Sequence, residues 1–375
     1  ATGQPYTSYI NSFTYPTTGQ TEIYRVKIRE NDTEIFNGWN LGQYGNKDRV
    51  RKIIAWGSQI ATTYYQAFKG TNLNKTGFTN TLPVDANGKV TKPIWVTSIT
   101  NFSVAFSQCN MPANADWSNW TSGLAATNLS SMFSGNTNFI GTGLANWNLT
   151  KVTNMAYFVG STAFNSDISG WDLQSCTNAS GLFSGTPFNH PSISNLNLHN
   201  ISNINSMFLG CTAFNQDVNT KVVGTGADAY LAWDTDPVTV MYGCFKGCQS
   251  FDYSIGKWNI GQLDAFSALA SFFYDVGDNL TNGYTHDLLT KDVTVGAGTP
   301  VAKTYVAWDV SQVNGFGGTS QNYTTTQGMF QNGKFNGDIS NWDTSGLGAQ
   351  GGHAYSAAGE WGRVFFNNPI FNQDI

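Results

Sequence analysis

The residue types that could perform chemistry are scattered along this chain of 375 residues. The segment VVGTGADA at 222–229 contains G-x-G-x-x-A, a loose dinucleotide-binding fingerprint, but no helical pattern follows it. Carboxylates could pair as they do in glycosidases, although nothing in the sequence selects one pair. The histidines show neither H-x-x-x-H spacing nor a neighbouring G-x-S-x-G motif; they are His190, His199, His286 and His353. The sequence therefore predicts a non-enzymatic protein without a cofactor. A carbohydrate-active enzyme is the least favoured of three possible functions.

The cysteines do not form a metal or redox pattern. There are five of them, an odd number, and no C-x-x-C motif. Cys109, Cys211 and Cys248 each follow a phenylalanine by three residues, and no histidine accompanies them at ligand spacing. We expect small buried thiols at a repeating core position.

Asn and Asp recur together after a phenylalanine, in the phrase F-N-x-D. Two interpretations are open: side-chain hydrogen bonds in a tight return turn, or a ladder of calcium ligands. Because a calcium loop needs more than one carboxylate per turn, the turn is favoured and no metal site is predicted. The pairs are Asn165 and Asp167, Asn215 and Asp217, Asn336 and Asp338, and Asn372 and Asp374.

These phrases belong to an internal repeat of about 25 residues, which is the main signal in the sequence. A phenylalanine anchors each copy, and a tryptophan recurs in step with it. Stacking such units would bury both aromatic positions. The predicted core columns are Trp147, Trp171, Trp233, Trp258, Trp308, Trp342, Phe158, Phe183 and Phe208.

Each unit combines an alternating apolar segment with a turn. ISGWDLQSCTN (168–178) and ISNLNLHNISN (193–203) follow L-x-x-L-x-L, with Trp allowed at the second apolar position. The alternation predicts a short strand, and the apolar pair that follows has helical or 3₁₀ spacing. We expect a repeat solenoid with a leucine-rich-repeat-like parallel β-sheet and a short helical, 3₁₀ or irregular convex side.

The repeat pattern resembles that of the BspA-like leucine-rich-repeat surface proteins. The family pattern combines W-D-x-S, N-M-x-x-M-F-x-G and F-N-x-D-I-S, and this chain follows it over about 50–375, with NINSMFLG (203–210) in place of the second phrase. IIAWGSQIATTYYQAFKGTNL (53–73) is similar to the entry segment of that family. The resemblance implies display on bacterial surfaces, or encoding by viruses and microbial eukaryotes, and a role in adhesion without catalytic residues. The Gly-rich segment 344–366 departs from the pattern.

Three insertions read as β-hairpins, near 82–95, 220–234 and 290–309. The first carries the turn signal Asn87-Gly88. The other two share T-K, a valine-rich run, a glycine-rich turn and Y-[LV]-A-W-D. Such insertions either mark a binding face or cover a sheet edge, and both interpretations stay open. The candidate binding residues are Asn87, Tyr230, Tyr284 and Tyr305.

The two ends differ from the repeat. Residues 1–49 lack it and predict a β-rich N-terminal cap or anchoring segment, ahead of a solenoid domain at 50–375. FNQDI at 371–375 begins a unit that is not completed. We therefore expect the solenoid to continue beyond this point or to dock another chain there.

Composition limits the partners. Charged residues make up 11% of the chain and the formal net charge is −5, without a basic run. This excludes nucleic acid, and the lack of a run of about 20 apolar residues excludes membrane insertion. We expect an extracellular or cell-surface protein that mediates adhesion through the solenoid face and hairpins, or alternatively a structural virion component such as a phage fibre or capsid decoration. Its partners would be a protein or glycan on a cell or particle, and other copies in an assembly.

Overall fold

The computed structural model describes residues 67–70, 82–92, 97–120, 124–263, 269–311, 313, 316, 328–344 and 364–373. The chain divides into two compact units, Ala1–Glu34 and Ile35–Ile375, and every described residue belongs to the second. The predicted cap at 1–49, and most of the glycine-rich segment 344–366, lie outside the described residues.

Regular secondary structure in the described part of the chain consists of short 3₁₀ helices and two hairpins. Pro191 opens the longest of the helices, where its fixed φ suits the first helical position. The helices are η4 (Ser118–Trp120), η5 (Leu144–Asn146), η6 (Pro191–Asn195) and η7 (Gly226–Asp228). The strands are β1 (Lys221–Val223), β2 (Tyr230–Ala232), β3 (Lys291–Val295) and β4 (Lys303–Ala307).

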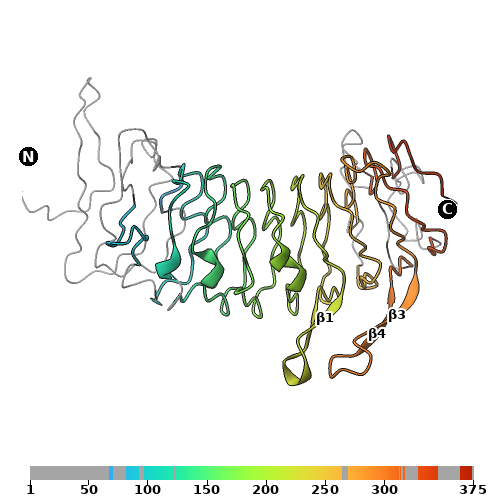
Figure 1. The fold of residues 1–375 in the computed structure, drawn as a ribbon, viewed down its shortest axis with the longest axis horizontal. Helices are drawn as coiled ribbons and strands as arrows, with labels where there is room; N and C mark the ends of the chain where they lie inside the picture. Colours follow the sequence, from blue (N-terminus) through green and yellow to red (C-terminus); the bar gives the residue numbers. More distant parts are fainter. Residues whose placement is uncertain are drawn as a thin grey trace, which may run out of the picture. The chain divides into compact units, whose positions relative to one another are not determined.

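Consecutive repeats pair through a column of asparagines in parallel register, and each repeat forms one coil, here called a rung (Figure 1). In each rung the asparagine side chain shapes the following turn: Asn154 Oδ1 accepts a hydrogen bond from Ala156 N at 3.0 Å. The parallel bridges join Asn101 to Asn128, Asn128 to Asn154, Asn154 to Asn178, Asn178 to Asn203, and Asn203 to Val240.

The backbone after each asparagine alternates between pairing with the next rung and closing turns within its own. Met155 N donates to Asn178 O at 2.8 Å, whereas Phe158 N donates to Met155 O at 3.0 Å. This alternation places Tyr157 in the left-handed region, at φ 53°. The parallel contacts among the described residues are consequently single bridges, and the strands are those of the hairpins. A leucine-rich-repeat-like parallel sheet stays a prediction.

The core is built from the recurring aromatic side chains. Phenylalanine rings of neighbouring rungs lie in contact, for example Phe183 and Phe208, whose centroids are 5.8 Å apart. Such pairs add to the free energy gained by burying the rings. All the predicted column residues are buried, and Trp342 is the most exposed of them at 9%.

The tryptophan column is also hydrogen-bonded. Trp258 Nε1 donates to Val218 O at 2.8 Å, and Trp233 Nε1 donates to Ile193 O at 2.7 Å. A fully buried indole N–H needs such a partner, and each bond ties one rung to an earlier one. Tryptophan therefore supplies packing area and an inter-rung hydrogen bond at the same position.

Three of the cysteines, Cys109, Cys211 and Cys248, share one position beside the phenylalanine column. All five are free and buried. The Cys211 thiol donates to Phe183 O at 3.0 Å, and the Cys248 thiol donates to Phe208 O at 3.2 Å. Burial raises the pKa of Cys211 to about 11, so its thiol stays neutral and can act as a donor.

Candidate interaction surface at the paired hairpins

The first predicted hairpin is built into the stack of rungs. Val84 bridges Val90 in antiparallel orientation, and Val90 is fully buried. The Asp85 carboxylate accepts the backbone N–H of Asn87 at 2.8 Å, which shapes the turn. Lys89 bridges Asp116 in parallel, so this hairpin belongs to a rung and only its tip, including Asn87, is exposed.

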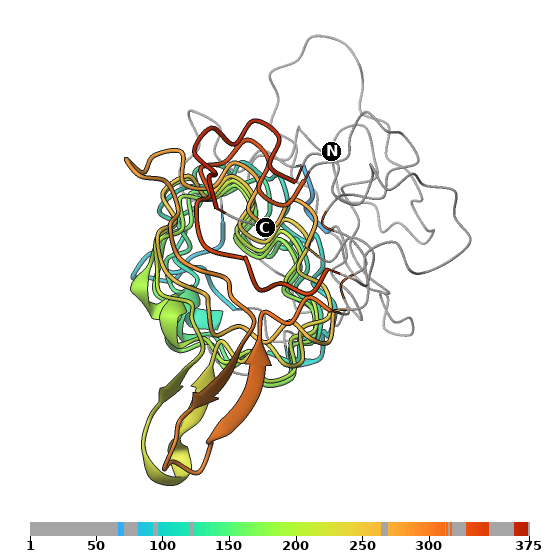
Figure 2. The ribbon, with the colours of Figure 1, turned by 90° about the vertical axis from the view of Figure 1, so that its right-hand side faces the viewer.

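The second and third hairpins project together from one side of the rungs and lie side by side (Figures 1 and 2). In one, Val222 of β1 pairs with Leu231 of β2; in the other, Val293 of β3 pairs with Tyr305 of β4. A Cβ atom added to Gly296 would lie 2.8 Å from Val222 Cγ2, which shows that the two hairpins touch. Segments about 70 residues apart in the sequence thus form one structure.

The third hairpin has an inner and an outer face, because side chains alternate along its strands. Val293 and Val295 are buried, whereas Thr294 between them is exposed. On the outer face, Thr294 and Thr304 join their hydroxyls across the strands at 2.9 Å. Val306, which is 40% exposed, and its exposed partner Asp292 lie on the same face. The outer face is therefore a mixed surface of hydroxyl, methyl and carboxylate groups open to solvent.

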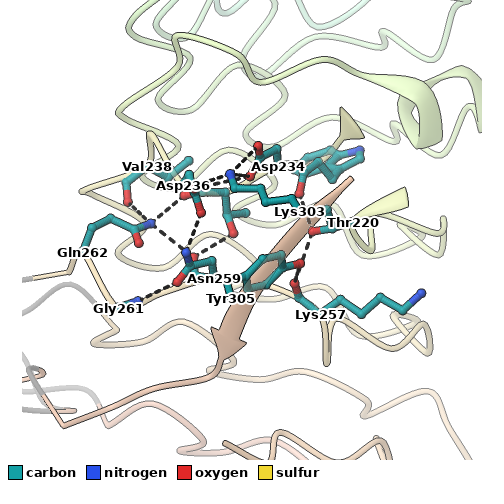
Figure 3. A network of polar contacts seen from close by, with 12 residues as sticks. Thr220, Asp234, Asp236, Val238, Lys257, Asn259, Gly261, Gln262, Lys303 and Tyr305 are labelled. Carbon is teal, nitrogen blue, oxygen red and sulfur yellow. Dashed lines mark hydrogen bonds and ion pairs between the residues drawn. The ribbon is translucent and has the colours of Figure 1, made fainter. Parts of the chain in front are cut away.

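A partly exposed ion cluster holds the third hairpin against the base of the second (Figure 3). We call it the latch; it consists of Lys303, Asp234 and Asp236. Lys303 Nζ lies 2.8 Å from Asp234 Oδ2 and also contacts the Asp236 carboxylate. Burial lowers the pKa of Lys303, but hydrogen bonds to both carboxylates outweigh burial, so that its pKa is raised overall.

Neutral side chains support the latch from the next rung (Figure 3). Asn259 Nδ2 donates to Asp236 Oδ1 at 2.5 Å. Gln262 Nε2 donates to Thr235 O at 2.6 Å and to Val238 O at 2.9 Å. These bonds orient the 234–238 loop, so the carboxylates are already placed for Lys303.

Two of the tyrosines expected to bind a partner anchor the hairpins, and their role in binding stays a prediction. Tyr230 OH donates to Asn195 O at 2.7 Å, and Tyr305 OH donates to the carbonyl oxygen of Lys257. Burial raises the pKa of Tyr305 to about 12, which keeps the hydroxyl protonated as a donor. Both rings are half-buried, so their main role is to fix the hairpins on the rungs.

Tyr284 belongs to the core, which corrects its assignment as a surface binding residue. It is fully buried, and its ring stacks on Phe251 at 5.8 Å and on Phe335 at 5.9 Å. Its hydroxyl donates to Tyr253 O at 3.1 Å. Tyr284 occupies the position that phenylalanine has in the F-N-x-D phrases, which is why it packs inside.

In the F-N-x-D phrases the aspartate makes a hydrogen bond within its turn, as predicted, whereas the asparagine joins one rung to the next. The Asn165 side-chain oxygen accepts from Asn189 N at 2.8 Å, and that of Asn189 accepts from Asn215 N at 2.7 Å. Asp167 Oδ1 accepts from Ser169 N at 2.8 Å. Over the described residues there is no group of three or more His, Cys, Asp or Glu that could hold a metal ion. In the same part of the chain, no helix is long and apolar enough to cross a membrane.

We expect the Lys303→Met substitution to loosen the third hairpin. It removes the cation between two carboxylates and leaves them to repel each other. The expected loss is about 1–2 kcal/mol of local opening free energy, because the cluster is partly exposed. Hydrogen exchange of the β3 and β4 amides should become roughly tenfold faster. Lys291→Met, an exposed position on the same hairpin, is the control. Equal exchange in the two variants would contradict a role for the latch.

Comparison with protein families yields one match. A family model described as "Mycoplasma protein of unknown function, DUF285" matches residues 100–222, 227–288 and 303–375. The matched segments cover more than half of the chain. The breaks between them fall at the tip of the second hairpin and across β3 and the turn that follows it. No curated protein and no solved structure matches the chain.

Proposed function

The chain belongs to the DUF285 family of Mycoplasma proteins of unknown function, and we propose that it is a non-enzymatic recognition protein displayed outside the cell. In this proposal the rungs form a BspA-like leucine-rich-repeat solenoid that acts as a scaffold. The paired hairpins are the surface that contacts a protein or glycan on another cell or particle.

The observation that carries this proposal is that two insertions far apart in the sequence form one structure that projects from the rungs. The hairpins touch at Val222 and Gly296, and the latch fixes Lys303 to Asp234 across 69 residues of sequence. Covering an edge would not require a second hairpin locked to the first. Preorganised loops on a rigid scaffold reduce the entropy lost on binding, which favours a contact surface.

The position of the insertions in the family match also supports recognition. The family model matches the rungs on both sides of each hairpin but leaves residues 223–226 and 289–302 unmatched. The tip of the second hairpin, and β3 with the turn that follows it, thus lie outside the matched repeat, whereas β2 and β4 lie within it. Insertions that lie on one side of a repeat protein are often where its binding specificity resides.

The test is binding of the full, fluorescently labelled chain to cultured epithelial cells, measured by flow cytometry. We expect saturable binding that the variant Thr225→Arg/Thr304→Arg lowers at least about tenfold, since it places bulky charges on both hairpins. Thr225 and Thr304 are exposed, and the matched control Thr137→Arg/Thr142→Arg alters exposed threonines elsewhere. Trypsin and periodate treatment of the cells separate protein from glycan partners. Lack of saturable binding, or equal binding by both variants, would contradict the proposal.

A further inference from the structure

A row of hydroxyl side chains crosses consecutive rungs. Each member is the residue just before a position in the column of parallel bridges, which is an asparagine in five rungs and Val240 in the last. Four of its members are exposed and the other two are half-buried. Because one member comes from each rung, the hydroxyls repeat at about the 4.8 Å spacing of paired backbones. The members are Thr100, Thr127, Thr153, Thr177, Ser202 and Thr239, and we call them the hydroxyl row.

The hydroxyl row is held in one orientation by its own hydrogen bonds. Thr153 Oγ1 donates to Thr127 O at 3.0 Å, and Thr177 Oγ1 donates to Thr153 O at 3.2 Å. The same bond recurs at 3.2 Å from Ser202 and at 3.4 Å from Thr239. From Thr127 to Thr239, each hydroxyl donates its only proton to the backbone and keeps lone pairs for solvent. The row therefore presents ordered acceptors and suits a ligand rich in hydroxyl donors.

Charge is sparse along the hydroxyl row, and the charged residue nearest to it in sequence is Lys151, which is exposed and lies two residues before Thr153. The row and the four residues that follow it in each rung are 100–104, 127–131, 153–157, 177–181, 202–206 and 239–243, and none is Asp, Glu, Lys, Arg or His. Within each rung the asparagine side chain is engaged with the turn, as Asn128 Oδ1 is with Ser130 N at 2.9 Å. A charged partner would find few counterions here, so the surface favours a neutral one.

An aromatic ring interrupts this polar surface at one rung. Tyr157 has φ 53° at a position where the neighbouring rungs have Ser131, Gly181 and Ser206. A Cβ added to Gly181 would lie 2.3 Å from Tyr157 Cε1, which shows that the ring lies directly over that glycine. The side chain is nevertheless 39% exposed. The left-handed backbone belongs to the repeat, since Val104 has φ 60° at the equivalent position. What distinguishes Tyr157 is its exposed aromatic ring.

We propose that the hydroxyl row and Tyr157 bind a neutral, linear polysaccharide. Ordered acceptors at a constant spacing match a polymer that offers the same hydroxyl donors on every unit. The exposed Tyr157 ring supplies the flat apolar face on which a sugar ring stacks. The scarcity of charge disfavours nucleic acids and acidic glycans. This site is separate from the hairpins and does not depend on their proposed role.

The test is affinity electrophoresis of the full chain in gels that contain dextran, laminarin, hydroxyethyl cellulose or galactomannan. We expect retardation by at least one of these, and none by heparin or alginate. Tyr157→Ser, which installs the residue found in neighbouring rungs, should weaken binding about tenfold. Thr153→Val/Thr177→Val should also weaken it, because valine keeps the shape and removes the acceptors. Circular dichroism checks that each variant is folded.

The control is the hairpin variant Thr225→Arg/Thr304→Arg, which should bind polysaccharide like the unmodified chain. Its result separates this site from the hairpin surface, because the two proposals can fail independently. Three outcomes would overturn the inference: no retardation by any of the neutral polymers, retardation only by the acidic ones, or binding that Tyr157→Ser leaves unchanged. Self-association that hides Tyr157, seen by analytical ultracentrifugation, would assign this face to contacts between copies instead.

Discussion

Replacing Trp258 by alanine should lower the free energy of unfolding by about 3–5 kcal/mol, as for other large aromatics removed from a packed core. Trp258 is fully buried, and its ring stacks on Trp233 with centroids 5.8 Å apart. The substitution opens a cavity between rungs and also leaves Val218 O without its indole donor. Urea denaturation followed by circular dichroism measures the change.

The variant Trp258→Phe divides this effect into its parts. Phenylalanine retains much of the packing but cannot donate to Val218 O, so we expect a smaller loss of about 1–3 kcal/mol. An alanine variant with an unchanged denaturation midpoint would show that the tryptophan column does not stabilise the stack. Equal losses in the two variants would instead assign the whole effect to the hydrogen bond.

Replacing Asn136 by alanine should lower the free energy of unfolding by about 2–4 kcal/mol, because it leaves several buried backbone groups unpaired. Asn136 is fully buried. Its Nδ2 donates to Phe106 O at 2.8 Å and to Phe133 O at 2.6 Å, and its Oδ1 accepts from Met111 N at 3.0 Å. One side chain thus connects three backbone segments. Thermal and urea denaturation measure the loss.

Asn138 provides the matched control for this substitution. It is the same residue type two positions later and is exposed. Asn138→Ala should change the free energy of unfolding by less than about 0.5 kcal/mol, as surface substitutions usually do. If Asn136→Ala behaved like Asn138→Ala, water would have to satisfy the backbone groups that Asn136 now pairs.

The aromatic core positions could be predicted from the sequence because they recur. A position that faces the interior in one rung does so in the next, so Trp171 and Phe183 are recognisable from spacing alone. The same logic places the cysteines: Cys211 and Cys248 share a position relative to the phenylalanine, and both are fully buried. The hairpin segments were visible because their valine-rich runs flank glycine turns, a purely local signal.

The roles of the tyrosines could not be predicted, because each depends on a single distant contact. Tyr305 hydrogen-bonds to Lys257, which is 48 residues away, and no repeat or motif records that pairing. Tyr284 looked available for binding beside a hairpin, but it occupies the core position of a missing phenylalanine. Residue type suggested a contact surface in both cases, and packing assigned the side chains to the interior or to an anchor.

By itself the sequence determined the repeat, its buried aromatic positions and the segments that leave it, since these follow from periodicity and local turn chemistry. Only the tertiary structure decided that two hairpins form one surface, because Lys303 reaches Asp234 through space and not through any sequence pattern. It also decided that parallel contacts between rungs are single bridges, since left-handed residues such as Tyr157 interrupt the extended backbone. Long-range ion pairs and backbone handedness depend on how the rungs stack, which no single repeat specifies.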